Sequence, residues 1–129
     1  MDFQDAKSIS ASAMRAQTNR LRFITENIAN ADTPGYRRKV ATFKEVVDQG
    51  RETGRVQSGP VELDRSALDR IYDPSHPLAN GDGYYDGSNV DLVVEIADAR
   101  AAQRSNEANL RMFDQARKMR SSLLDILKR

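Results

Sequence analysis

The stretch that decides the fold begins at Ser88, ends at Arg129 and reads SNVDLVVEIADARAAQRSNEANLRMFDQARKMRSSLLDILKR. It contains no glycine and no proline, the two residues that destabilise a helix interior most. Apolar and small side chains recur along it at steps of three or four residues, from Leu92 to Ile126. This spacing predicts one long amphipathic helix, which at ~1.5 Å per residue would extend about 55–60 Å.

Polar residues mark the start of this helix and one point along its apolar stripe. Ser88 and Asn89 are both residue types that cap helices, and Asp91 favours the positive end of the helix dipole. Asn106 lies on the stripe itself, where a polar side chain weakens association but fixes register. A solvated break in a long helix is the alternative interpretation of Asn106.

A second stretch without helix breakers precedes Pro34, because all seven glycines and all four prolines lie between Pro34 and Gly87. Its side chains form a narrow seam, which suits a partner helix better than a broad globular core. The residue before a proline is pushed out of the helical region, so this helix is expected to end within residues 32–35. The seam comprises Met14, Gln17, Leu21, Ile24, Ile28 and Ala31.

The middle of the chain carries turn signals and short apolar runs. Residues 40–47 are expected to form a strand pair or a short helix, and residues 55–57 and 61–63 resemble short strands around a turn at 58–60. Further turns are predicted at 73–77, 80–83 and 86–87. We therefore expect a small β-containing insert between two long helices. A helical hairpin that folds only on itself is the alternative to helices that pack on other subunits.

The composition argues against several classes of protein. Twenty basic residues nearly balance nineteen acidic ones, so the net charge of +1 gives no electrostatic footprint for nucleic acid or an anionic membrane. No stretch approaches the ~20 apolar residues of a membrane span, and the N-terminal residues do not resemble a secretory signal. The absence of cysteine rules out a disulfide framework and a thiolate metal site.

No arrangement of residues indicates catalysis or a cofactor. His76, the sole histidine, lies in a predicted turn, where a surface or packing role is expected rather than general-base chemistry. The segment from Asp82 to Gly87 superficially resembles a calcium loop, but Tyr84 and Val93 occupy positions that need oxygen ligands. We therefore predict a non-enzymatic protein with no cofactor and no metal.

Two asparagine-rich clusters are harder to explain as ordinary surface. Asn27 and Asn30 lie three residues apart near a helix end, where their amides can bond exposed carbonyls or a neighbouring backbone. A simple helix terminus is the alternative. The second cluster, residues 104–109, contains Asn106 and Asn109.

These clusters belong to a longer pattern that resembles the family of flagellar rod, hook and related axial proteins. The amino-terminal signature reads SAMxAQxxRL at residues 12–21 and NIANxxTPGY at residues 27–36. The motifs DPSHPLA at 73–79, GY at 83–84 and NVD at 89–91 are similar to the central signature of C-type proximal rod proteins. Glu95, Arg104, Ala108 and Asn109 resemble the family's carboxy-terminal helix. The resemblance covers nearly the whole chain.

Two features depart from the C-type pattern. Asn106 stands where many relatives carry an aromatic residue, and Tyr36 follows the asparagine block without the insertion that many relatives have. The direct join is common in the sister B-type rod protein, which therefore remains an alternative. The DPSHPLA motif favours the C type.

The resemblance implies a mainly α fold in which two long terminal helices pair as a coiled coil, with a small β or irregular insert between them. Residues 1–33 and 89–129 would form the inner, axial part and residues 34–88 an outer layer. The implied function is that of a structural rod subunit that transmits torque in the periplasm. It would assemble with copies of itself and other rod proteins, after export through the flagellar type III apparatus without a cleaved signal. A self-contained helical adaptor protein is the rival function.

The residues expected to form the assembly interface combine the apolar seams with the asparagine clusters. Part of each apolar stripe should stay uncovered until other subunits bind, because a lone subunit buries only one side of each helix. The predicted interface residues are Met14, Gln17, Leu21, Ile24, Asn27, Ile28, Asn30, Ile96, Asn106, Asn109, Leu110, Phe113 and Leu123.

Overall fold

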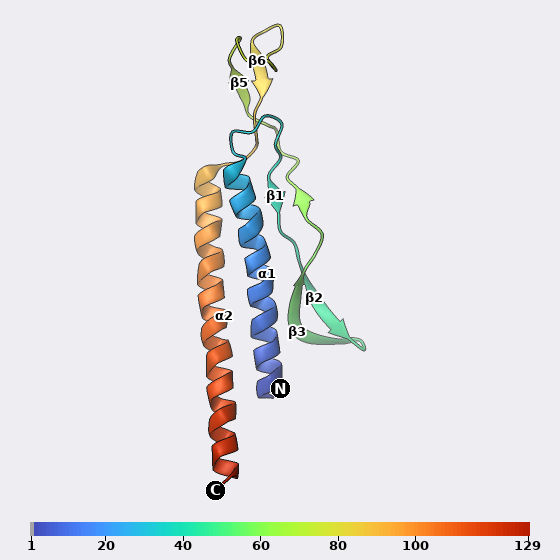
Figure 1. Cartoon of the computed structure of the whole chain (residues 1–129). Coiled ribbons are helices and arrows are strands. Elements are labelled where there is room, and N and C mark those ends of the chain that lie inside the picture. Colours follow the sequence, from blue (N-terminus) through green and yellow to red (C-terminus); the bar gives the residue numbers. More distant parts are fainter. Residues whose placement is uncertain (1) are drawn as a thin grey trace.

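The structure, a computed structural model, describes residues 2–129. Helix α1 (Phe3–Ala29, 27 residues) and helix α2 (Leu92–Leu127, 36 residues) lie side by side and antiparallel, and α2 extends past the N-terminal end of α1 (Figure 1). Short strands lie between them in the chain, so the predicted arrangement of two long helices around a small β insert is confirmed. None of the helices in residues 2–129 has the length and hydrophobicity that a membrane span requires.

Helix α1 begins at a capping box and ends earlier than the sequence predicts. The Asp2 carboxylate accepts a hydrogen bond from the Asp5 backbone N–H at 2.7 Å, and the Asp5 carboxylate accepts one from the N–H of Asp2. At its other end the helix stops at Ala29, before residues 32–35. The Asn30 side chain donates to the Glu26 carbonyl at 2.8 Å, which satisfies one of the last carbonyls and lets the chain turn there.

Helix α2 is capped by Asp91, so the prediction that Ser88 or Asn89 caps it is wrong. The Asp91 carboxylate accepts a hydrogen bond from the Val93 backbone N–H at 3.0 Å, at the positive end of the helix dipole. Ser88 and Asn89 instead hold the insert and the end of α1, because their side chains form hydrogen bonds there.

The insert contains three two-stranded antiparallel sheets (Figure 1). They pair β1 (Lys39–Val40) with β4 (Glu62–Leu63), β2 (Phe43–Asp48) with β3 (Arg51–Ser58), and β5 (Arg70–Tyr72) with β6 (Tyr84–Asp86). Of the two predictions for residues 40–47, strand structure is confirmed. The turn expected at 58–60 does not join strands that pair with each other, because β3 pairs back with β2 and β4 pairs with β1.

The β2–β3 hairpin turns at Gln49 and Gly50 and runs alongside α1 (Figure 1). Both residues have positive φ values, 48° and 79°, as a two-residue hairpin turn of type I′ requires. The Val56 N–H of β3 donates to the Ser12 hydroxyl of α1 at 3.1 Å, and this hydroxyl donates to the Ile9 carbonyl. The hairpin is therefore attached to the first half of α1.

The hydrophobic core is thin and lies along the contact between the helices. Its buried apolar residues are Ala16, Phe23 and Ile24 of α1 and Ala102 and Ala116 of α2. The distance between packed helices depends on the side chains at the contact, and small alanines allow a close approach. Most large apolar side chains of α2 remain exposed, so the fold leaves apolar surface for other molecules.

Candidate assembly surface and the network that supports it

Asn27 lies near the end of α1 and is fully buried, with 0% of its surface exposed. Its side chain pairs with both backbone groups of Lys39. The Lys39 N–H donates to Oδ1 and Nδ2 donates to the Lys39 carbonyl, each at 2.9 Å. The Tyr36 hydroxyl donates to the same Oδ1 at 2.8 Å. Of the two interpretations of this cluster, a specific polar contact is confirmed for Asn27.

Glu95 of α2 is also fully buried and joins the same network. Arg38 Nε donates to its Oε1, and Asn27 Nδ2 donates to its Oε2 at 3.3 Å. Arg38 reaches α2 a second time, since its Nη2 donates to Asp98 at 3.0 Å. Arg20 of α1 lies 3.7 Å from Asp98. A paired charge cluster therefore links α1, α2 and the start of the insert.

Ser88 and Asn89 connect this network to the rest of the insert. The Ser88 hydroxyl donates to the Ala31 carbonyl, just beyond the end of α1. The Asn89 side chain accepts from the Arg38 N–H at 2.7 Å and donates to the Asp64 carbonyl at 2.9 Å. Both residues therefore fix the direction in which the chain enters α2.

Sequence reasoning missed the partnership between Arg38 and Glu95. A weak signal was present, because Glu95 is a carboxylate beside Ile96 on a helix that has an apolar stripe. A carboxylate buried in such a place needs a cation, and residues 37–39 form the longest basic run of the chain. Spacing alone does not say which of these three cations approaches α2.

Burial and hydrogen bonding shift the pKa values of groups around the network. Burial raises the pKa of the Tyr36 hydroxyl, which keeps this group protonated as a donor to Asn27. Lys39 Nζ donates to the Glu26 carboxylate at 2.7 Å. This hydrogen bond lowers the pKa of Glu26 and raises the pKa of Lys39, so folding favours the charged form of both.

The Glu26–Lys39 pair is expected to stabilise the fold only within a pH window. Because the pKa of Glu26 is lowered, its contribution is present above the unfolded value of about 4.3 and is lost as the pH falls through the folded value. Because the pKa of Lys39 is raised, its contribution is present below about 10.4 and is lost as the pH rises through the folded value.

In urea unfolding, Glu26→Gln should therefore lower the free energy of unfolding between about pH 5 and pH 10, with a difference that shrinks outside this range. Glu52→Gln, at an exposed position of strand β3, is the matched control and should show no such window. A difference between wild type and Glu26→Gln that stays the same at about pH 3 would contradict a role for this ion pair.

The structure divides the predicted interface residues into three groups by burial. Buried within the subunit are Ile24 and Asn27; half-buried are Met14, Gln17, Leu21, Asn30, Asn106, Asn109 and Phe113; exposed are Ile28, Ile96, Leu110 and Leu123. The exposed group is accessible to other molecules, whereas Ile24 and Asn27 act inside the subunit. The part that each residue plays in assembly stays a prediction.

Gln17 and Asn106 each bury the oxygen of a side-chain amide that has no hydrogen-bond partner within residues 2–129. Helix α2 runs unbroken past Asn106, so the interpretation of this residue as a break in the helix is wrong. An unsatisfied buried amide destabilises a fold. A polar residue that fixes the register of a helix seam is expected to weaken the contact in this way. That role for Asn106 stays a prediction.

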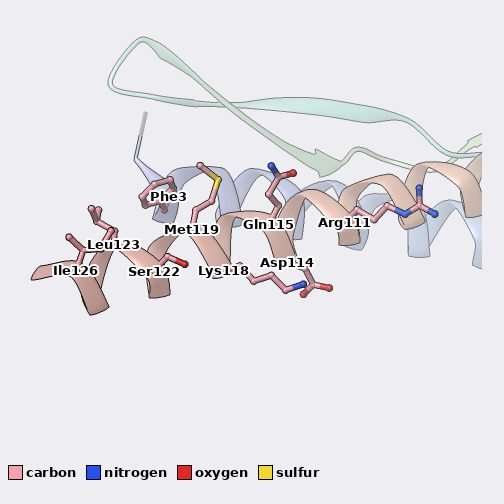
Figure 2. A pocket seen from close by; sticks show the side chains of 9 residues that line it. All are labelled: Phe3, Arg111, Asp114, Gln115, Lys118, Met119, Ser122, Leu123 and Ile126. Carbon is pink, nitrogen blue, oxygen red and sulfur yellow. The ribbon is translucent and has the colours of Figure 1, made fainter. Parts of the chain in front are cut away.

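Beyond the start of α1, the end of α2 exposes an apolar groove of about 620 Å³, here called the terminal groove. Figure 2 shows that Phe3 of α1 and Met119, Leu123 and Ile126 of α2 line it. A second groove of about 480 Å³ shares Phe3 and Met119 and continues between the two helices. These grooves are suited to apolar contacts with another protein.

His76 has a packing role in the turn before β6. Its ring stacks on Tyr85, with ring centres 3.9 Å apart, and its Nδ1 accepts a hydrogen bond from the Leu78 N–H at 3.1 Å. Within residues 2–129, no group of three or more histidine and acidic side chains is placed to hold a metal ion. The apolar surface of the helices is therefore the strongest candidate for a functional site.

Two family models match the ends of the chain. Residues 8–37 match the model described as flagella basal body rod protein, and residues 82–126 match the C-terminal region of flagellar basal body rod FlgEFG proteins. The chain is 40% identical over 130 residues to the flagellar basal-body rod protein FlgC of Agrobacterium fabrum, an alignment that covers 95% of this chain and 94% of that protein. The chain belongs to the FlgC family of flagellar basal-body rod proteins.

Other members of the FlgC family are also similar to this chain over most of their length. The FlgC protein of Salmonella typhimurium is 33% identical, with 86% of this chain and 87% of that protein covered. The FlgC protein of Bacillus subtilis is 29% identical, with 92% and 94% covered. Membership of the FlgC family favours the C type over the B type and makes this chain a structural subunit of the basal-body rod that assembles with other rod proteins.

Proposed function

We propose that α1 and α2 form the inner, axial part of the rod and that residues 34–88 form an outer layer around it. The proposal rests on one observation: large apolar side chains are exposed on the first turns of α2 and again along its second half, from Leu110 to Leu127. They include Ile96, Leu110, Met112, Met119, Leu123, Leu124 and Ile126. A soluble monomer rarely exposes this many large apolar side chains on one helix unless another molecule covers them.

The energetics of this surface favour association through many residues at once. Leu110 is 51% exposed and Leu123 is 47% exposed. Complete burial of a leucine contributes about 1.5–3 kcal/mol, so covering the remaining half contributes roughly 1 kcal/mol per residue. One such contact does not hold two subunits together against the entropy lost on association, but a row of them does.

The buried network supports this function by joining the layers. Arg38 and Lys39 at the start of the insert are bonded to Asn27, Glu95 and Asp98 on the two helices. A force applied to the helices is therefore transmitted to residues 34–88 through several hydrogen bonds rather than through a loose linker. Such a connection suits a rod that carries torque.

Two lysine substitutions on α2 test the proposal. Leu110→Lys with Leu123→Lys should weaken association about 30-fold, because about 2 kcal/mol of apolar burial is lost. Sedimentation velocity over a concentration series measures the association, and motility of a gene-deletion strain carrying the variant measures rod function. Phe43→Lys with Val47→Lys, on exposed strand β2, is the matched control and should leave both nearly unchanged.

Two results would oppose the proposal. Equal loss of association in both double variants would show that the α2 surface has no special part in assembly. A wild-type chain that keeps the mass of one subunit at every concentration, alone and with other rod proteins, would favour the self-contained adaptor. Circular dichroism of each variant should first show unchanged helix content, so that unfolding does not explain the result.

We further propose that the chain works without catalysis in the periplasmic part of the basal body. In this proposal it reaches that place through the flagellar type III apparatus without a cleaved signal. The absence of cysteine supports export of an unfolded chain, because no thiol can form a wrong disulfide on the way. The small buried core also supports export of an unfolded chain, since little tertiary structure has to unfold first.

A further inference from the structure

The far end of the insert contains every place in the chain where an asparagine or aspartate directly precedes a glycine. In such a pair, the backbone nitrogen of the glycine can attack the side-chain carbonyl carbon of the residue before it, because glycine has no side chain that obstructs the approach. The attack closes a five-membered ring, a succinimide. The reaction needs a glycine nitrogen that is free and a side chain that solvent reaches. The three pairs are Asn80–Gly81, Asp82–Gly83 and Asp86–Gly87.

Backbone hydrogen bonds hold the glycine nitrogen in two of these pairs. The Gly83 N–H donates to the Asn80 carbonyl at 3.0 Å, and the Gly87 N–H donates to the Asp69 carbonyl at 2.7 Å. The Gly81 N–H has no hydrogen-bond partner within residues 2–129. A nitrogen whose N–H is already bonded must break that bond before it attacks, which costs free energy. Gly81 therefore carries the nitrogen that is ready to react.

The side chain of Asn80 is exposed, and its carbonyl group is held next to this nitrogen. Its Oδ1 accepts hydrogen bonds from the N–H groups of Asp82 and Tyr84, both at 3.0 Å. The bond from Asp82 closes a turn that includes both the Asn80 Cγ and the Gly81 nitrogen, so the two reacting atoms stay close together. The two N–H donors also stabilise the negative charge that develops on Oδ1 during the attack.

We propose that Asn80 is a deamidation site of the folded chain. The Gly81 nitrogen loses its proton to water or hydroxide and forms a bond to the Asn80 Cγ. The bond between Cγ and Nδ2 breaks, and Nδ2 takes a proton from water and leaves as ammonia. A further water molecule then opens the succinimide at one of its two carbonyl carbons. The product is an aspartate or an isoaspartate at position 80.

The two products differ in their effect on the loop between β5 and β6. An aspartate keeps an oxygen in place for the N–H groups of Asp82 and Tyr84 and adds one negative charge. An isoaspartate places one more carbon atom in the main chain. The bond from the Asn80 N–H to the Tyr84 carbonyl, at 2.8 Å, then no longer fits the register of the loop. We therefore expect the loop to lose order where isoaspartate forms. The reaction needs no other subunit, so this inference is independent of the proposed function.

Asn89 is an internal reference for the reaction. Trypsin cuts after lysine and arginine, so it releases residues 71–100 as one fragment that contains both asparagines. Asn89 is followed by Val90, whose branched side chain obstructs attack by the backbone nitrogen. The Asn89 Nδ2 also donates to the Asp64 carbonyl at 2.9 Å. Deamidation at Asn89 is therefore expected to be slow.

Mass spectrometry of this fragment tests the proposal after incubation of the purified chain at physiological temperature and pH. Asn80 should deamidate at least about tenfold faster than Asn89. The rate should rise with pH, because the nitrogen attacks after it has lost its proton. An isoaspartate-specific methyltransferase should label part of the product. Equal rates at the two asparagines would overturn the proposal, and so would a reaction at Asn80 that occurs only in urea.

Gly81→Ala separates the proposed route from direct hydrolysis of the amide. A Cβ at this position would have no other atom within 4 Å, so alanine fits without disturbing the loop. The methyl group should slow deamidation of Asn80 about tenfold, because it obstructs the nitrogen. Hydrogen exchange of the Tyr84 amide should show that the loop keeps its structure. An unchanged rate in this variant would show that Gly81 takes no part and would overturn the proposed route.

Discussion

Replacing Arg38 with alanine is expected to lower the free energy of unfolding by about 3–5 kcal/mol, because one member of a buried charge pair would remain without its partner. Glu95 is fully buried and accepts a hydrogen bond from Arg38. Without the guanidinium, its carboxylate keeps only the Asn27 amide, at 3.3 Å. Asp98 would also lose its closest cation. Domains of this size are typically stable by about 5–15 kcal/mol, so this substitution removes a large part of the stability and raises the fraction of unfolded molecules.

Urea unfolding followed by circular dichroism measures this effect. Arg51→Ala, at the exposed hairpin turn, is the control and should change the free energy of unfolding by less than about 0.5 kcal/mol. The double variant Arg38→Met with Glu95→Leu should recover most of the loss, because it removes both charges and keeps similar volumes. A loss of less than about 1 kcal/mol for Arg38→Ala would contradict a buried, charged Glu95.

The second large effect is expected for Asn27→Ala, which should lower the free energy of unfolding by about 2–4 kcal/mol. This change removes the partners of the Lys39 N–H and carbonyl, and it also takes away the acceptor of the Tyr36 hydroxyl. Alanine leaves space without supplying any hydrogen bond. The insert should therefore separate from the helices more often, and the Lys39 amide should exchange with solvent much faster.

Hydrogen exchange of the Lys39 amide and urea unfolding measure the two consequences. Asn30→Ala is the matched control, because within residues 2–129 the Asn30 side chain bonds only to the Glu26 carbonyl and the Thr33 hydroxyl, both close to its own helix end. It should lower the free energy of unfolding by about 0.5–1 kcal/mol and leave Lys39 protected. Equal effects of the two substitutions would show that Asn27 acts as a simple helix terminus after all.

Local properties of the chain are sufficient to predict that the two helices form. A run without glycine or proline and apolar residues at helical spacing are sufficient to predict α2, because both act within a few turns of one helix. The end of α1 was predicted less well. Pro34 limits how far a helix can run, but hydrogen bonding by Asn30 ends it at Ala29, where no proline is near.

The same reasoning does not predict which strands pair with each other. Residues 55–57 and 61–63 were both recognised as extended, yet they pair with β2 and β1 rather than with each other. The deciding turn is Gln49–Gly50, which lacks the Asn-Gly or Asp-Gly pattern typical of such hairpins. Pairing is a property of two segments, and their separate patterns do not determine it.

The sequence by itself determined that two long helices flank a small β insert, that each helix carries an apolar stripe, and that the chain carries the signature of flagellar axial proteins. Only the tertiary structure decided that Asn27 binds the Lys39 backbone and that Arg38 rather than its neighbours reaches Glu95. Helix period and breaker content act over a few residues. The buried contacts join residues 12 and 57 positions apart, so they exist only once the chain has folded and excluded water from between them.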